Sequence, residues 1–149
     1  MHFSGPSKLL EAIAGAFLLV AVAFAQPDST DASNFITVAT GSQPSPSDPR
    51  IAVVQSQLQT IQRYCASRSR GASITDKMAK SHSLLQVKQP LLALLTDFVR
   101  VARAQCSAVD DSTLLSLYVL ERNSGAQHGS TIDRLSKNPG ALVAKWSSR

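Results

Sequence analysis

Acidic side chains are scarce in this chain of 149 residues, and glutamate is the scarcest of them. Glu11 lies in the N-terminal segment, so Glu121 is the one glutamate beyond residue 25. A glycosidase usually needs a second carboxylate at a defined separation, and the loop that follows Glu121 contains no substrate motif. We therefore interpret Glu121 as a surface residue, expect no catalytic residues, and predict a non-enzymatic protein.

Metal and cofactor motifs are missing as well. The sequence has no CxxC pair, zinc-ligand spacing, HExxH, EF-hand loop, phosphate-binding glycine loop or GxSxG elbow. Met78 and His82 lie four residues apart, but the only other histidine beyond residue 25 is His128. We interpret Met78 as a core residue and His82 as a half-buried boundary residue, and we expect no cofactor and no metal.

Aromatic residues make up only 5% of the chain, so a core has to be built from leucine, valine, isoleucine and alanine. Strands are enriched in aromatic and β-branched residues, whereas packed helices are not. The composition therefore favours an all-α fold, and no segment beyond the linker shows the alternation of a strand.

Charge is absent from residues 12–25, and this stretch ends in the small residues Ala23 and Ala25. The pattern is typical of a signal peptide, residues 1–25, cleaved after Ala25. The alternative is an uncleaved membrane anchor over residues 9–25. The uncharged run spans about 21 Å as a helix, against ~30 Å for a hydrocarbon core, and Glu11 is costly within a membrane.

Residues 26–48 are rich in Ser, Thr, Pro and Asp, a composition that predicts a disordered linker. Phe35, Ile36, Thr37 and Val38 form a short β-prone island within it. We interpret this island as a patch that docks loosely on the domain, and the alternative is an edge strand offered to a partner.

Residues 49–149 are predicted to form one small helical bundle with three main helices and one or two shorter C-terminal helices. Apolar residues recur at spacings of three and four in about 49–65 and 90–106, and a capping box at Ser73 opens the helix between them. Asp110 is a candidate cap for a fourth helix, and Ser130 begins another capping box.

Cys65 and Cys106 are the only cysteines, and in an oxidising compartment they form a candidate disulfide. Both lie at the C-terminal ends of predicted helices. These ends meet only if the chain turns at Pro90. If Pro90 merely kinks one continuous helix, its two ends lie on the order of 45 Å apart and the bond cannot form.

The formal net charge is +5, and most of the basic residues are scattered. Basic residues are dense only in residues 63–80, which give a candidate basic patch with the members Arg63, Arg68, Arg70, Lys77 and Lys80. The expected partner is another protein or an anionic envelope surface. We expect no nucleic acid, and membrane contact only if the N-terminal segment stays uncleaved.

Together these features predict a secreted or periplasmic binding or accessory protein that acts through protein–protein or envelope-surface contacts. The alternative is a membrane-tethered subunit of an envelope complex, with residues 9–25 as its anchor.

Overall fold

The structure, a computed structural model, describes residues 26–66 and 71–149, and within them it contains seven α-helices and no strand. The all-α expectation is therefore confirmed for these residues. The helices, in chain order, are α1 (Ser29–Thr40), α2 (Arg50–Cys65), α3 (Ile74–Ser83), α4 (Leu91–Gln105), α5 (Asp111–Asn123), α6 (His128–Lys137) and α7 (Pro139–Ser147).

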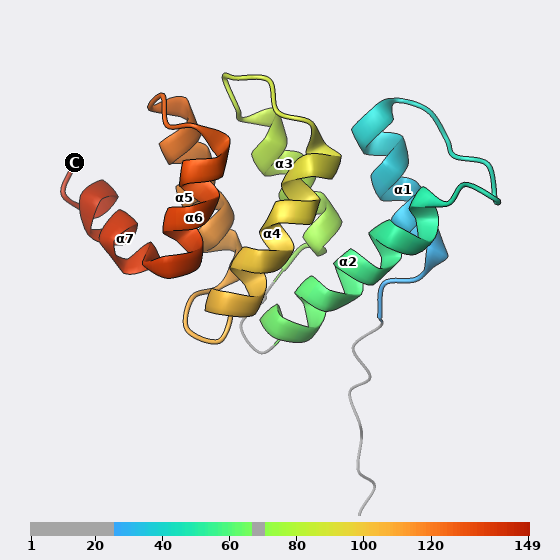
Figure 1. The fold of residues 1–149 in the computed structure, drawn as a ribbon, viewed down its shortest axis with the longest axis horizontal. Coiled ribbons are helices and arrows are strands. Elements are labelled where there is room, and N and C mark those ends of the chain that lie inside the picture. The colour runs from blue at the N-terminus through green and yellow to red at the C-terminus, as the bar shows by residue number, and fades with distance from the viewer. Residues whose placement is uncertain (1–25, 67–70) are drawn as a thin grey trace, which may run out of the picture.

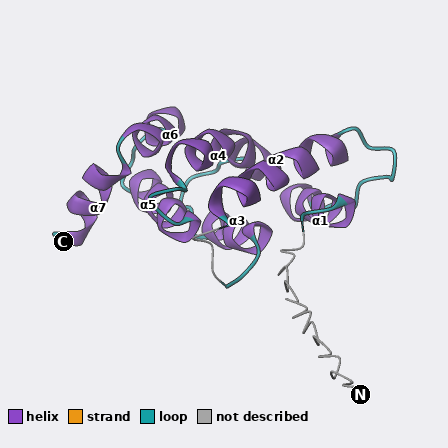
Figure 2. Ribbon diagram, turned by 90° about the horizontal axis from the view of Figure 1, so that it is seen from below, coloured by secondary structure: helices purple, strands orange, loops and turns teal. Residues whose placement is uncertain are grey.

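The helices are arranged as three hairpins packed side by side, α1/α2, α3/α4 and α5/α6 (Figure 1). Figure 2 shows two layers, one formed by α1, α3 and α5 and the other by α2, α4 and α6, with α7 at one end. Each amphipathic hairpin leaves apolar surface that the next hairpin covers, so a continuous core runs between the layers.

Helices α2 and α4 run in the same direction, and their C-terminal ends are joined. The Sγ atoms of Cys65 and Cys106 lie 2.06 Å apart, and their Cα atoms lie 4.8 Å apart. Helix α3 ends at Ser83 and α4 begins at Leu91, so the chain turns before Pro90 rather than continuing as a kinked helix. The predicted turn and the predicted cysteine pair are both confirmed.

Side-chain caps explain where several helices begin. The Ser73 hydroxyl accepts a hydrogen bond from the backbone N–H of Asp76, and the Asp110 carboxylate accepts one from Thr113. Each cap satisfies an amide that has no partner within its own helix. The box expected at Ser130 is not used, because α6 begins earlier, at His128.

The disordered linker predicted for residues 26–48 is wrong for residues 29–40, which form helix α1. Asp28 accepts hydrogen bonds from the N–H groups of Thr30 and Asp31, and Phe35 and Ile36 are fully buried. The Phe35–Val38 island is therefore neither a loose patch nor an edge strand. Phe35 and Ile36 lie on the buried face of α1, which contacts α2, α3 and α4, whereas Val38 is exposed.

The expectation of three main helices also needs correction, because α3 is only ten residues long while α5 has thirteen. The Asn123 amide at the end of α5 donates to the Leu84 carbonyl and accepts from the Gln86 N–H. These contacts satisfy the backbone just beyond α3, so that the helix can end early.

The predicted signal peptide, residues 1–25, lies outside the described residues. Among the residues that are described, no helix has both the length and the apolar character that crossing a membrane requires.

Candidate interaction surface

A basic edge is formed where helices α2, α4 and α6 end. These helices run parallel, and Figure 1 shows their C-terminal ends along the same side of the molecule. Arg63 lies in the last turn of α2, Arg103 in the last turn of α4, and Arg134 and Lys137 in the last turn of α6. The Cys65–Cys106 pair joins the ends of α2 and α4. The Gln105 side-chain amide at the end of α4 donates a hydrogen bond to the Ser136 carbonyl at the end of α6.

Charge is divided unequally between the two layers. Helices α2, α4 and α6 contain six Lys or Arg residues and two Asp residues, whereas α1, α3 and α5 contain three basic and four acidic residues. Arg100, one of these six basic residues, occupies an exposed position in the middle of α4. We refer to Arg63, Arg100, Arg103, Arg134 and Lys137 together as the basic face.

The structure divides the basic patch predicted from the sequence. Arg63 is exposed and belongs to the basic face, while Lys80 is exposed on α3 in the other layer. Lys77 donates to Asp111 at 3.0 Å, and both side chains are largely buried. Arg68 and Arg70 lie outside the described residues. Among the described members, Lys77 is thus engaged in a largely buried ion pair, and Arg63 and Lys80 lie on helices of different layers.

A shallow apolar groove of about 290 Å³ lies between the N-terminal halves of α2 and α4. Val53, Val54 and Leu92 supply its apolar lining, and the Gln57 amide donates to the Thr96 hydroxyl across it. Because α2 and α4 are joined at their C-terminal ends and diverge toward their N-terminal ends, the groove lies at the open side of this pair (Figure 1).

Glu121 is not the surface residue that the sequence suggested, because its side chain is fully buried. Its carboxylate accepts hydrogen bonds from Arg134 on α6 at 2.7 Å, and from Lys145 and the Trp146 indole on α7. Burial alone would raise the pKa of Glu121, but these donors outweigh it and hold that pKa below its ordinary value. The carboxylate thus fastens α7 to the hairpin stack.

A second polar network links α4, α5 and α6. The His128 Nε2–H donates to Asp97 at 2.7 Å, and in the neutral ring Nδ1 accepts from the Tyr118 hydroxyl at 2.8 Å. Burial raises the pKa of Tyr118, and the nearby charge of Arg122 opposes that shift. Tyr118 is fully buried, so this chain of hydrogen bonds serves to position the three helices.

Met78 and His82 occupy the positions that the sequence indicated. Met78 is fully buried, and His82 is half-buried with its Nε2 hydrogen-bonded to the Gln89 carbonyl beside the turn before α4. Across the described residues, no three His, Cys, Asp or Glu side chains gather as ligands for a metal ion.

The residues of α4 and α6 in the basic face were not recognised as a site from the sequence, because they are distributed over about forty positions. A basic residue occurs in the last turn of each helix from α2 to α7, so this pattern in the sequence does not by itself single out α2, α4 and α6.

No protein-family model matches this chain, and comparison with curated proteins and with solved structures likewise gives no match. Any functional assignment therefore depends on the geometry and charge described above.

Proposed function

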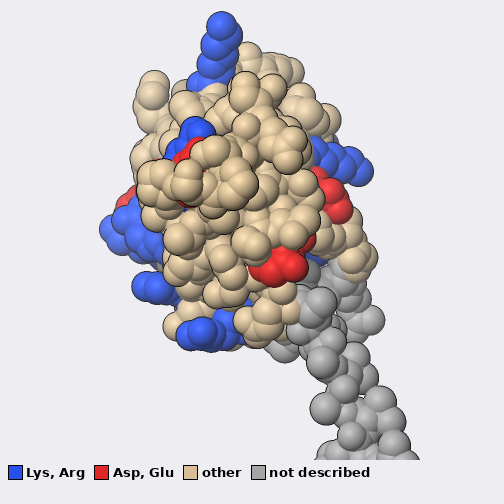
Figure 3. Space-filling view, turned by 90° about the vertical axis from the view of Figure 1, so that its right-hand side faces the viewer, with Lys and Arg blue, Asp and Glu red and all other residues tan. Residues whose placement is uncertain are grey.

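We propose that this is an exported, non-enzymatic binding protein that contacts an anionic envelope surface through its basic face. The observation that carries the proposal is the unequal division of charge between the two helical layers, with the cations concentrated on α2, α4 and α6. In Figure 3 several Lys and Arg side chains lie at the left-hand and lower edges, toward this layer and its C-terminal ends, and others project at the top and at the right.

Stabilisation of the helices themselves does not account for the whole basic face. A cation in the last turn of a helix interacts favourably with the helix dipole, which offers a structural role for Arg63 and Arg103. Arg100 lies more than a turn before the end of α4, where that effect has largely decayed. Its exposed position supports a role in contacts outside the molecule.

Export is the second part of the proposal. The cysteine pair at disulfide distance is compatible with an extracellular or periplasmic location, where such bonds persist. A cleaved leader at residues 1–25 is the corresponding sequence signal. The alternative, a tethered subunit with residues 9–25 as its anchor, is distinguished by the N-terminal residue of the native protein, which is Gln26 only after cleavage.

Vesicle binding tests the contact with an anionic surface. Protein purified from its native envelope or medium should co-sediment with vesicles that contain phosphatidylglycerol, and not with purely zwitterionic vesicles. High salt should abolish the binding, because exposed charges are screened. Equal binding to both kinds of vesicle, or none to either, would contradict the proposal.

Two double variants that remove the same charge identify the surface responsible. Arg63→Gln with Arg103→Gln should weaken vesicle binding about 30-fold, since each cation near such a surface contributes about 1 kcal/mol. The control is Lys80→Gln with Lys88→Gln, both exposed and outside the basic face. If the control loses as much as the test variant, net charge rather than the basic face governs binding.

A further inference from the structure

The connection between α1 and α2 differs in composition from every other connection in the described residues. Residues 42–47 read Ser-Gln-Pro-Ser-Pro-Ser, so that three hydroxyls alternate with prolines in six positions. All three serines, Ser42, Ser45 and Ser47, are exposed. Figure 1 shows this connection standing out from the helices at the end of the stack opposite α7.

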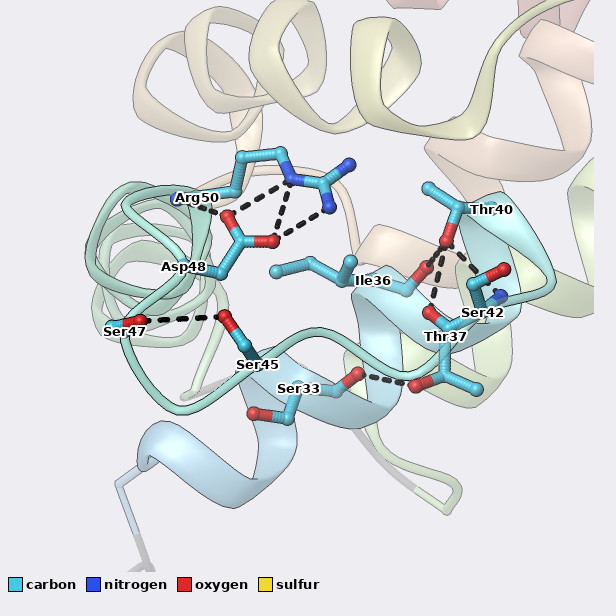
Figure 4. Close-up of polar contacts among 9 residues, drawn as sticks. All are labelled: Ser33, Ile36, Thr37, Thr40, Ser42, Ser45, Ser47, Asp48 and Arg50. Atoms are coloured by element: carbon cyan, nitrogen blue, oxygen red, sulfur yellow. Dashed lines mark hydrogen bonds and ion pairs between the residues drawn. The ribbon is translucent and has the colours of Figure 1, made fainter.

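The backbone of this connection has few partners within the molecule. The Ser42 N–H donates to the Thr40 hydroxyl, and the Asp48 N–H donates to the Ser45 carbonyl. The hydroxyls of Ser45 and Ser47 lie 3.4 Å apart and face each other outside the helices (Figure 4). Pro44 and Pro46 lack an N–H and restrict the residues before them to extended conformations, so the serines remain accessible to an enzyme.

The surroundings of these serines are almost free of charge. Between Ala32 and Gln62 only Asp48 and Arg50 are charged, and they form an ion pair of 2.6 Å with each other. Figure 3 faces this end of the molecule and shows mainly uncharged surface. A nearly neutral segment rich in hydroxyls and proline has a composition typical of segments that carry O-linked sugars.

We propose that Ser42, Ser45 and Ser47 form an acceptor site for O-linked glycosylation. The Oγ atom of serine attacks C1 of an activated glycosyl phosphate donor. The Oγ–C1 bond forms, the bond from C1 to the phosphate oxygen breaks, and the Oγ proton passes to a base of the transferase while the phosphate departs. The inference presupposes the export part of the proposed function, because the transferase has to meet the folded or emerging chain on its way out of the cell.

Intact-mass analysis of the native exported protein, followed by peptide mapping, tests the site. We expect species that carry one or more glycosyl residues, all on the peptide that contains residues 42–47. The triple variant Ser42→Ala, Ser45→Ala and Ser47→Ala should lose the added mass completely. Replacing the same three serines by threonine, which keeps the acceptor hydroxyl, should retain it.

The matched control removes three exposed serines that lie on helices without neighbouring prolines: Ser56→Ala, Ser116→Ala and Ser130→Ala. This variant should carry the same added mass as the native protein. Because all of the substituted side chains are exposed, each variant is expected to fold.

The same spectra separate failure of the site from failure of export. A chain that begins at Gln26 and carries no added mass overturns the glycosylation site and leaves export intact. A chain that retains residues 1–25 and carries no sugar overturns both. Phosphate at these serines, or sugar located only elsewhere in the chain, also overturns the proposed site.

Discussion

The two ends of the hairpin stack are held by different kinds of interaction. At one end, α1 contacts α2, α3 and α4 through buried apolar side chains, among them Phe35 and Ile36, and its neighbourhood has hardly any charge. At the other end, α7 buries Leu142, but its polar attachment depends on the single buried carboxylate of Glu121 and its three donors.

Because the two attachments differ in kind, the two ends of the stack should respond differently to pH. Burial of apolar surface does not depend on the protonation of any group, so the apolar packing of α1 is insensitive to pH. The attachment of α7 requires an ionised Glu121, and removing one partner of such a buried cluster leaves the others without a counter-charge. The α1 end is therefore the stronger attachment, and the α7 end is the one that conditions can loosen.

The largest expected effect is at the α1 end. Phe35→Ala should lower the free energy of unfolding by about 4 kcal/mol, because it removes a fully buried ring and leaves a cavity. Urea unfolding followed by circular dichroism measures this loss, which should be the same at pH 5 and pH 8. The exposed α1 residue Val38, changed to alanine, is the control and should leave stability almost unchanged. Equal losses at both positions would show that α1 does not pack as described.

A smaller effect is expected at the α7 end. Glu121→Gln keeps the shape of the side chain but weakens its charge-assisted hydrogen bonds, which should cost about 2 kcal/mol. Since Trp146 is the only tryptophan, its fluorescence should report the loosening of α7 directly. Asp133→Asn, which breaks the exposed pair with Lys137, is the control and should cost less than about 0.5 kcal/mol. A Trp146 signal that does not change would contradict the role assigned to Glu121.

Acid should loosen the α7 end before the α1 end. The pKa of Glu121 in the folded protein lies below its ordinary value of 4.5. Its stabilising contribution is therefore complete above that value and is lost as pH falls through the lower folded pKa. The native protein should lose stability over this range more steeply than Glu121→Gln, whose remaining slope reflects other carboxylates with lowered pKa values, such as Asp110. If the stability of the two proteins fell in parallel with pH, Glu121 would not be the group through which acid loosens α7.

The smallest effect is expected from the one ion pair at the α1 end. Arg50 is exposed and lies two residues from its partner Asp48, and ion pairs at the surface contribute little to stability. Replacing both, as Asp48→Asn with Arg50→Gln, should leave the unfolding curve unchanged within error. A clear loss would mean that charge matters at this end too, and the comparison between the two ends would fail.

Local signals in the sequence were sufficient to place three of the seven helices in the described residues. Capping residues and apolar spacing located α2 and α4 to within about a residue and the start of α5 at its cap, Asp110. The cysteine positions offered the disulfide, and the structure supplied the turn before Pro90 that it required. These features depend on neighbours within a few positions, or on one covalent constraint. The boundaries of α3 and α6 were less accurate, because contacts from other helices decide them.

Helix α1 and the role of Glu121 could not be predicted in this way. The composition of residues 26–48 is that of a linker, and only the surfaces of α2, α3 and α4 give Phe35 and Ile36 a place to be buried. Glu121 has the sequence context of a surface residue, and its burial follows from cations supplied by α6 and α7.

Local features of the sequence set the helical class and the start of several helices, because capping and periodicity act over short distances, and they offered Cys65 and Cys106 as a pair whose bond required a turn at Pro90. Only the tertiary structure decided which charges share a surface. Arg63, Arg103 and Lys137 are far apart in the chain, and they form one basic edge because parallel packing brings the ends of α2, α4 and α6 together. Long-range packing depends on how whole helical faces fit, and no single stretch of the sequence contains that information.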